Sequence, residues 1–263
     1  MEVLGYIFAF CIGVVLSLTG GGGSILTVPV LVYIFKVDPV LASVYSLFIV
    51  GVNSFLATFP KYKSGYVHLA TVWQFGLPSI AAVYVVRQFV VRNIPDSLFY
   101  INQTEITKSW VMMLFFSILM LFAGYAMSKQ NKIDGKPLKK RNGWGVAIRG
   151  LGVGVVTGLV GVGGGFLIIP TLVLFLGFPM KDAVGTSLFI ITINSAIGFT
   201  ADLGHYPLDW HFLLMFTIVG LLGVMAGALL NSKVSPSALK KYFGWMILLM
   251  GVYIFINEVL YFF

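Results

Sequence analysis

The sequence predicts an all-α protein: a polytopic transmembrane helical bundle built from two homologous halves. An apolar composition, long apolar runs that recur along the chain and an internal repeat lead to this fold class. Of the 263 residues, 59% are hydrophobic and only 10% are charged, and the mean hydropathy is +0.97. A soluble protein of this length needs a larger polar surface to cover its core, so the composition indicates a protein embedded in a lipid bilayer.

Apolar runs long enough to cross a bilayer follow one another from end to end of the chain. A helix that crosses the hydrocarbon core needs about 20 mostly apolar residues. Runs of this length lie at 40–59, 66–87, 108–127, 182–201, 210–230 and 240–262. We expect each of these runs to form a transmembrane helix.

The second half of the sequence repeats the first. Shifted by 141 residues, the sequence aligns with itself without a gap. Identities at this offset match Gly20, Gly22, Gly23, Pro29, Asn53 and Ser54 with Gly161, Gly163, Gly164, Pro170, Asn194 and Ser195. Apolar composition alone does not align glycines, prolines and asparagines at one offset, so the sequence predicts a duplication. The predicted parts are a first transmembrane repeat (1–128), a basic linker (129–143) and a second transmembrane repeat (144–263).

The positive charges indicate how the two halves face. The linker carries six basic residues against one acid, and short basic loops stay in the cytoplasm. Each half begins with a longer apolar stretch, 3–36 or 145–178, that is interrupted by glycines. If each stretch crosses the membrane once, the bases fall equally on both sides. If each stretch enters and returns, most bases face the cytoplasm, so the positive-inside rule favours inverted repeats with glycine-broken helices in the cell membrane.

The glycine clusters are the first candidate for a binding site. The arms that flank them are only about 24 and 18 Å long as helices, too short for a core of about 30 Å. Irregular backbone at that depth must be buried in protein or line a watered cavity. The arm after each cluster begins with free N–H groups at the positive end of a helix dipole, which attracts anions. Inverted halves would bring two such ends together near the midplane, and the alternative is close helix packing through small residues.

Polar side chains on the next helix of each half are the second candidate. Ser46 and Asn53 share one face of the predicted helix, and Ser187 and Asn194 repeat that face. These side chains either hold the broken neighbour by hydrogen bonds or line a cavity and bind an anion. The predicted substrate-binding residues, which include the hydroxyls at the equivalent positions 45 and 186, are Gly21, Gly22, Gly23, Ser24, Tyr45, Ser46, Asn53, Gly163, Gly164, Gly165, Thr186, Ser187 and Asn194.

The pattern does not indicate an enzyme or a metalloprotein. The single cysteine excludes an internal disulfide, and we find no metal-ligand spacing and no nucleophile–base pair, so we predict no catalytic residue, metal or cofactor. Charged residues are absent from the centres of the predicted spans. Arg149 comes nearest to an exception and is expected to reach the basic linker, and Arg87 is one of the few bases expected on the outer side. We therefore expect backbone dipoles, and not a buried base, to attract an anion. The net charge of +8 does not indicate nucleic acid, because the bases lie in short loops beside the lipid.

The duplicated motifs resemble those of the TauE/SafE sulfite exporter family over nearly the whole chain. The similar segments are Leu18–Ser24 followed by Pro29, and Gly158–Gly165 followed by Pro170 and by Gly185–Ser187. The resemblance implies a cell-membrane protein that moves small sulfur-containing or organic anions. It also implies about eight spans, a count that differs from two broken segments that each enter and return.

The sequence thus predicts a secondary carrier or facilitator for a small anion, such as sulfite, a sulfonate or another organic anion. The alternative is an anion channel that uses the same glycine-broken midplane site. The expected partners are the anionic substrate and the lipid bilayer, without nucleic acid, and a homo-oligomer is left open. The outer segment 93–107 is either a cap over the entrance or a slack connection.

Overall fold

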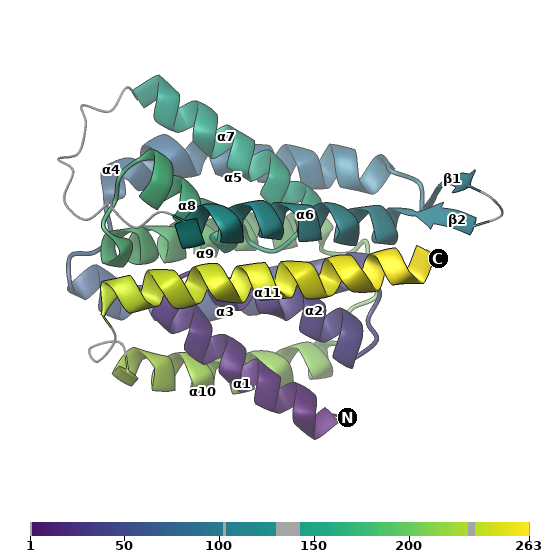
Figure 1. Cartoon of the computed structure of the whole chain (residues 1–263), viewed down its shortest axis with the longest axis horizontal. Coiled ribbons are helices and arrows are strands. Elements are labelled where there is room, and N and C mark those ends of the chain that lie inside the picture. The colour runs from purple at the N-terminus through teal and green to yellow at the C-terminus, as the bar shows by residue number, and fades with distance from the viewer. Residues whose placement is uncertain (1, 102–103, 130–142, 231–234, 263) are drawn as a thin grey trace.

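The computed structural model describes residues 2–101, 104–129, 143–230 and 235–262. Long helices lie side by side along one direction, and a β-hairpin projects from one end of the bundle (Figure 1). The helices are α1 (Glu2–Thr19), α2 (Gly22–Pro29), α3 (Pro39–Lys63), α4 (Leu69–Thr71), α5 (Leu77–Val85), α6 (Lys108–Lys129), α7 (Gly143–Val160), α8 (Gly165–Pro170), α9 (Met180–Asp202), α10 (Trp210–Leu230) and α11 (Pro236–Phe262). Residues 130–142, nearly all of the predicted linker, lie outside the described residues.

Several of these helices continue through wider turns. A π-helical turn joins α4 to α5, and further turns extend α5, so that Leu69–Asn93 forms one continuous helix. The short helices α2 and α8 are likewise extended by π-helical turns at Val30–Ile34 and Thr171–Phe175. Each of these two turns follows a proline, whose ring removes a backbone donor from the α-helical ladder.

Seven helices in the described part of the chain are long and apolar enough to cross a membrane. Six of them correspond to the six predicted runs, which are therefore confirmed as helices with ends shifted by a few residues. The seventh is α7, the first arm of the second half. The other apolar arms are shorter and cover Val3–Thr19, Gly23–Ile34 and Gly165–Phe175.

Both glycine clusters interrupt their helices, so the predicted glycine-broken helices are confirmed. The backbone leaves α1 at Gly20 and α7 at Gly161, where φ is 74° and 72°. A residue with a Cβ atom rarely adopts such positive φ values. The local sequence therefore decides where each rod ends.

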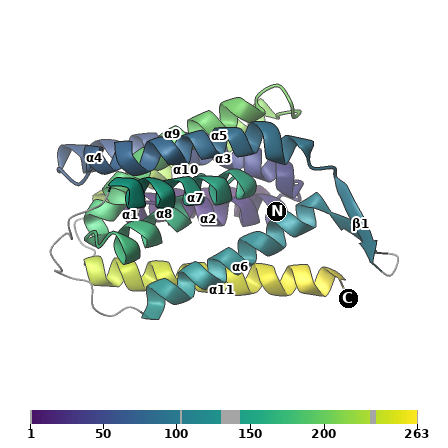
Figure 2. The same ribbon diagram turned by 90° about the horizontal axis from the view of Figure 1, so that it is seen from above.

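The largest contacts between the two halves form four helix pairs. α6 packs on α11, α3 on α9, α1 on α10 and α5 on α7. Exchanging every helix for the equivalent helix of the other half converts the α1–α10 pair into the α5–α7 pair and leaves the other two pairs unchanged. Figure 2 shows α6 and α11 crossing each other on one side of the bundle.

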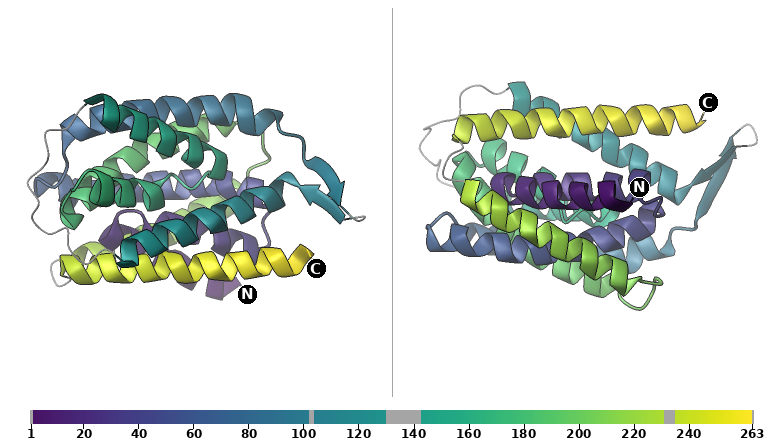
Figure 3. Two further views of the ribbon diagram at one scale, coloured as in Figure 1. Left: turned by 45° about the horizontal axis from the view of Figure 1, so that its top comes forward. Right: turned by 90° about the horizontal axis from the view of Figure 1, so that it is seen from below.

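The bundle has two distinct ends. Strands β1 (Ser97–Ile101) and β2 (Thr104–Thr107) form the antiparallel hairpin, and Figure 3 shows it beyond the helices at the same end as the C-terminus. The last turn of α6 and the first turn of α7 lie at the opposite end (Figure 1). Strand structure in segment 93–107 was not predicted from its sequence.

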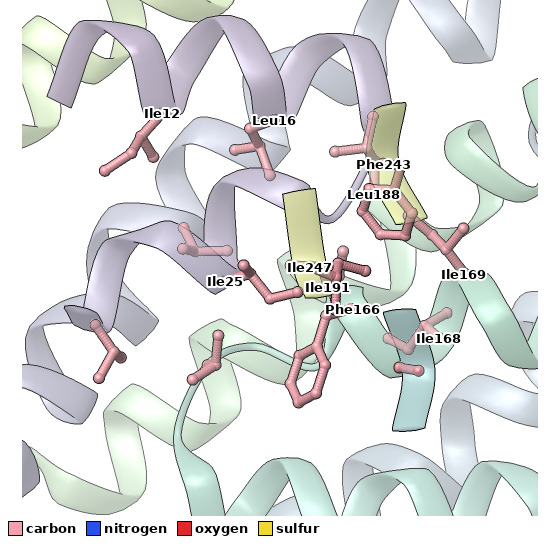
Figure 4. Packing of buried hydrophobic residues seen from close by; sticks show 14 of the residues in the cluster. Ile12, Leu16, Ile25, Phe166, Ile168, Ile169, Leu188, Ile191, Phe243 and Ile247 are labelled. Carbon is pink, nitrogen blue, oxygen red and sulfur yellow. The ribbon is translucent and has the colours of Figure 1, made fainter. Parts of the chain in front are cut away.

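The apolar core lies where the broken arms cross the long helices. Figure 4 shows side chains of α1 and α2 gathered around those of α8, α9 and α11. The labelled residues, each at most 1% exposed, are Ile12, Leu16, Ile25, Phe166, Ile168, Ile169, Leu188, Ile191, Phe243 and Ile247. This packing holds the two glycine breaks inside the bundle.

Candidate functional site

The two glycine breaks touch each other. A Cβ atom added to Gly21 would lie 2.5 Å from the carbonyl carbon and oxygen of Gly165. A Cβ atom added to Gly165 would lie 2.5 Å from the Cα atom of Gly21 and 3.1 Å from the Oγ atom of Ser24. Carbon atoms that are not bonded normally stay about 3.5–4.0 Å apart, so only glycine allows this contact between the two backbones. The sequence-predicted residues Gly21, Ser24 and Gly165 therefore meet in space.

Other predicted glycines fill tightly packed positions beside this contact. Gly22 is the first residue of α2. A Cβ atom on Gly23 would lie 2.5 Å from the Cβ atom of Leu16 on α1, one on Gly163 would lie 2.5 Å from the Oγ atom of Ser195, and one on Gly164 would overlap Thr157. These glycines allow the arms to pack closely on their neighbours.

Two serine hydroxyls tie the first break in place. Ser24 Oγ donates to the carbonyl oxygen of Gly21 over 2.6 Å. Ser187 Oγ lies 3.0 Å from the carbonyl oxygen of Gly20 and 2.9 Å from that of Val184, so its one proton bonds one of these two acceptors. Ser187 thus links α9 of the second half to the break of the first half.

Tyr45 and Thr186 anchor loops at equivalent positions. The Tyr45 hydroxyl accepts a hydrogen bond of 2.9 Å from the backbone N–H of Asp209. Thr186 Oγ1 accepts one of 3.1 Å from the backbone N–H of His68, the counterpart of Asp209 in the first half. Each hydroxyl therefore holds the loop that leads into the following helix of the other half.

Polar atoms without partners cluster on α3 and α9. In the described ranges, the buried side-chain nitrogen and oxygen atoms without a hydrogen-bond partner are Ser46 Oγ, Asn53 Nδ2, Asn53 Oδ1, Ser54 Oγ, Arg87 Nε, Asn194 Oδ1 and Ser195 Oγ. An unpaired buried polar group costs about 1–3 kcal/mol. A group of such atoms is therefore unusual in a structural core. We call the atoms of Ser46, Asn53, Ser54, Asn194 and Ser195 the polar seam of α3 and α9, and it includes the predicted asparagines of both helices.

The two predicted asparagines differ in their surroundings. Asn194 Nδ2 donates to Ser79 Oγ over 2.8 Å. In the other half, Gly220 takes the position of Ser79, and a Cβ atom added to Gly220 would lie 2.5 Å from Asn53 Nδ2. Because the glycine offers no hydroxyl, the Asn53 amide keeps its hydrogen-bonding capacity.

A buried ion pair lies beside the second break. Arg87 Nη1 and Asp202 Oδ2 are 2.7 Å apart, and the two side chains are 0% and 5% exposed. Arg87 Nη2 also donates to Ser43 Oγ over 3.1 Å, and a Cβ atom added to Gly161 would overlap this nitrogen. The sequence predicted no buried base near the glycines, and the structure corrects this.

The reason for this correction lies in the tertiary structure. Arg87 stands at the end of a predicted span, where sequence reasoning expects it to reach the lipid headgroups. The only sequence signal was the acid Asp202, which stands just past the end of another span. The two residues are 115 positions apart and meet only because α5 and α9 pack together.

The buried charges of the described residues are mainly positive. These residues are Lys61, Arg87, Lys108 and Asp202. Lys108 Nζ donates to the carbonyl oxygen of Val91 over 2.6 Å at the end of the α5 rod. Lys61 lies in the last turn of α3, at the other end of the bundle. Three buried cations therefore stand against one buried anion.

Three of the pockets in the described part of the chain lie at the surface of the bundle. Two are apolar crevices of about 340 Å³ each, one between α3 and α9 and one beside α6, α7 and the end of the Leu69–Asn93 helix. The third, of about 700 Å³, lies near the hairpin and is lined by the carboxyl groups of Asp38, Asp96, Glu105 and Glu258. These four carboxylates repel anions, so this pocket is a poor candidate for the predicted anion site.

Comparisons with known proteins identify a family and several relatives. The family model described as sulfite exporter TauE/SafE matches residues 6–254. A probable membrane transporter protein of Xylella fastidiosa strain Temecula1 is 26% identical over 250 residues, which cover 92% of this chain and 90% of the relative. Probable membrane transporter proteins of Methanocaldococcus jannaschii and Bacillus subtilis are also 26% identical, over 94% and 91% of this chain and 92% of each relative. No solved structure matches the chain significantly.

Proposed function

Because the chain belongs to the TauE/SafE family and is a membrane transporter rather than an enzyme, we propose that it moves a small anion through the region where the glycine breaks meet. Sulfite, a sulfonate and another small organic anion are the candidate substrates. The observation that carries this assignment is the excess of buried positive charge: Lys61, Arg87 and Lys108 against Asp202. A buried charge is costly unless it is compensated, so this interior favours an anion over a cation.

The binding site consists of the two glycine breaks and the polar seam of α3 and α9. Asn53 Nδ2 and the hydroxyls of Ser46, Ser54 and Ser195 are buried donors without partners, and they suit an anion that has shed its water. The arms α2 and α8 begin at the breaks, so their dipoles add positive potential there. In this scheme Tyr45 and Thr186 support the site through their contacts with the loops.

The two halves are inverted repeats in this scheme. Support comes from the symmetric helix pairs and from the equivalent helices α6 and α11, which run in opposite directions along the bundle (Figure 1). The basic ends of α3 and α9, with Lys61, Lys63 and Lys181, then face the cytoplasm together with the linker, and the hairpin faces out. Rocking of one half against the other would open the site alternately to each side.

Direct contact between the breaks favours a carrier over a channel. A channel needs a path that is open to both sides at once, whereas the backbones of Gly21 and Gly165 meet without space for a side chain. Saturable flux with exchange of internal for external anion is the expected behaviour. Large single-channel currents in planar bilayers would instead identify a channel.

Flux measurements in proteoliposomes test this function. Purified wild-type protein is expected to give saturable flux of sulfite or of a sulfonate, and a thermal-shift screen of anions should identify the ligand that raises the apparent stability. Gly165→Leu should abolish the flux because its side chain must push the breaks apart. Gly152→Leu is the matched control, since a Cβ atom at Gly152 meets nothing within 4 Å. Normal flux in correctly inserted Gly165→Leu protein would remove the breaks from the pathway.

A further inference from the structure

The Arg87 guanidinium has more hydrogen-bonding capacity than its neighbours use. A guanidinium carries five N–H donors in a planar fork. Nη1 donates to Asp202 and Nη2 donates to Ser43, while Nε has no partner. The contact with Asp202 is a single hydrogen bond and not the parallel pair that a guanidinium and a carboxylate can form. The geometry therefore leaves Arg87 with hydrogen-bond donors that its neighbours do not use.

We infer that Arg87 is a substrate-binding residue and that Asp202 occupies its guanidinium until the transported oxyanion displaces the carboxylate. This inference rests on the proposed function, because it assigns a residue to the transport of an anion. It goes further by naming the group that recognises the substrate and the internal group that competes with it.

The position of Arg87 joins this ion pair to the glycine break. The guanidinium reaches from the α5 rod to Ser43 on α3 and Asp202 on α9, and it fills the space beside Gly161 that a side chain would need. Gly161 has a φ of 72° and is the first residue of the break after α7. Movement of that break would therefore move the surroundings of the guanidinium, which couples binding at Arg87 to the broken helix.

The pair has no counterpart in the other half. The positions equivalent to Arg87 and Asp202 are Ala228 and Lys61, and Val184 takes the place of Ser43 beside Gly20. The first break is thus stable without an ion pair, so a general need to brace a glycine break does not explain Arg87. The departure from symmetry indicates a specific role at one end of the pathway.

Charged neighbours would compensate a displaced Asp202 carboxylate. Arg87, His205 and Lys108 act electrostatically on Asp202, and Asp96 and Asp38 act on Lys108. A displaced Asp202 carboxylate would keep Lys108 and His205 within electrostatic reach, so it would not be left alone in the interior.

The fork predicts which anions bind. Sulfite, sulfonates and carboxylates present two oxygens that can accept parallel hydrogen bonds from Nη1 and Nη2. Asp202 lies against Nη1, so its carboxylate must leave when an oxyanion binds this edge. A halide presents one centre and cannot form that pair. Oxyanions are therefore expected to bind at Arg87 in preference to chloride.

Opposite effects of two substitutions test the inference. With full-length protein in nanodiscs, the dissociation constants of sulfite and methanesulfonate are measured by calorimetry. Asp202→Asn removes the competitor and should tighten binding about tenfold, as expected if the carboxylate occupies Arg87 in about nine of ten molecules. Arg87→Gln should abolish binding. Arg92→Gln, which removes an exposed charge nearby, should leave it unchanged.

The double variant Arg87→Gln/Asp202→Asn distinguishes a role of Arg87 in binding the anion from a role of the ion pair in stabilising the fold. It replaces both charges of the ion pair by neutral amides, so no unpaired charge stays buried if the single variant is unstable. We expect this variant to stay folded and to bind no oxyanion. Wild-type affinity in the double variant, or a loss of binding in both single variants, would overturn the inference while wild-type flux still supports an anion transporter. Absence of anion binding and flux in the wild type would overturn the proposed function and this inference together.

Discussion

Alanine at position 165 should destabilise the protein, whereas alanine at position 152 should stabilise it. At Gly165 the new Cβ atom would lie 2.5 Å from the Gly21 Cα atom, about 1 Å inside the normal separation of carbon atoms. The second close atom, Ile191 Cδ1 at 2.7 Å, ends a flexible side chain and can move, but the Gly21 backbone cannot move alone. Overpacking of this kind costs about 1–3 kcal/mol.

Gly152 provides the opposite case. It lies within α7, it is exposed, and a Cβ atom there meets nothing within 4 Å. Alanine then removes the entropic penalty of glycine in a helix, which is about 0.5–1 kcal/mol. The two variants should therefore differ by about 1.5–4 kcal/mol in the free energy of unfolding.

Reversible unfolding in mixed micelles, followed by circular dichroism, measures this difference. Gly21→Ala provides a second variant at the same contact, since its Cβ atom would lie 2.5 Å from the Gly165 carbonyl group. It should be destabilised like Gly165→Ala. If Gly165→Ala and Gly21→Ala are as stable as Gly152→Ala, the two backbones do not touch and the site has no basis.

Three further predictions concern other parts of the molecule. Ser79→Ala should destabilise the fold by about 1–3 kcal/mol, because Asn194 Nδ2 loses its acceptor; an unchanged free energy of unfolding would show that the bond is unimportant. Burial, and then the charge of Asp202, raise the pKa of the Tyr206 phenol above its ordinary 10.0, so stability should fall as pH rises above about 10, where the unfolded chain loses this proton first. That fall should be smaller in Tyr206→Phe when unfolding is measured against pH. In a Cys11→Ser background, an impermeant maleimide should label His205→Cys from outside and Ser64→Cys only after permeabilisation, and labelling of both from one side would refute the inverted repeats.

The sequence alone determined the class of the protein, the helical runs and the two breaks. These features have local causes. An apolar run of about 20 residues specifies a membrane helix whatever its neighbours are. Glycines such as Gly20 and Gly161 permit positive φ values that end a helix where other residues would continue it. Repetition of both signals at one offset was enough to predict two similar halves and the position of the candidate site between them.

Only the tertiary structure decided which partner each polar side chain has. Tyr45 and Thr186 are predicted substrate-binding residues, yet their hydroxyls hold loops of the opposite half. Asn53 and Asn194 are equivalent in sequence, but a glycine or a serine on the facing helix decides which amide is free.

The sequence also did not show which charged partner Arg87 has. Its place at the end of an apolar run indicated contact with lipid headgroups, whereas the packing of α5 against α9 buries it with Asp202. Hydrophobicity and backbone preference act over a few neighbouring residues, so they can be read along the chain. Hydrogen bonds and ion pairs depend on which helices meet and at what register, and this depends on the packing of the whole bundle.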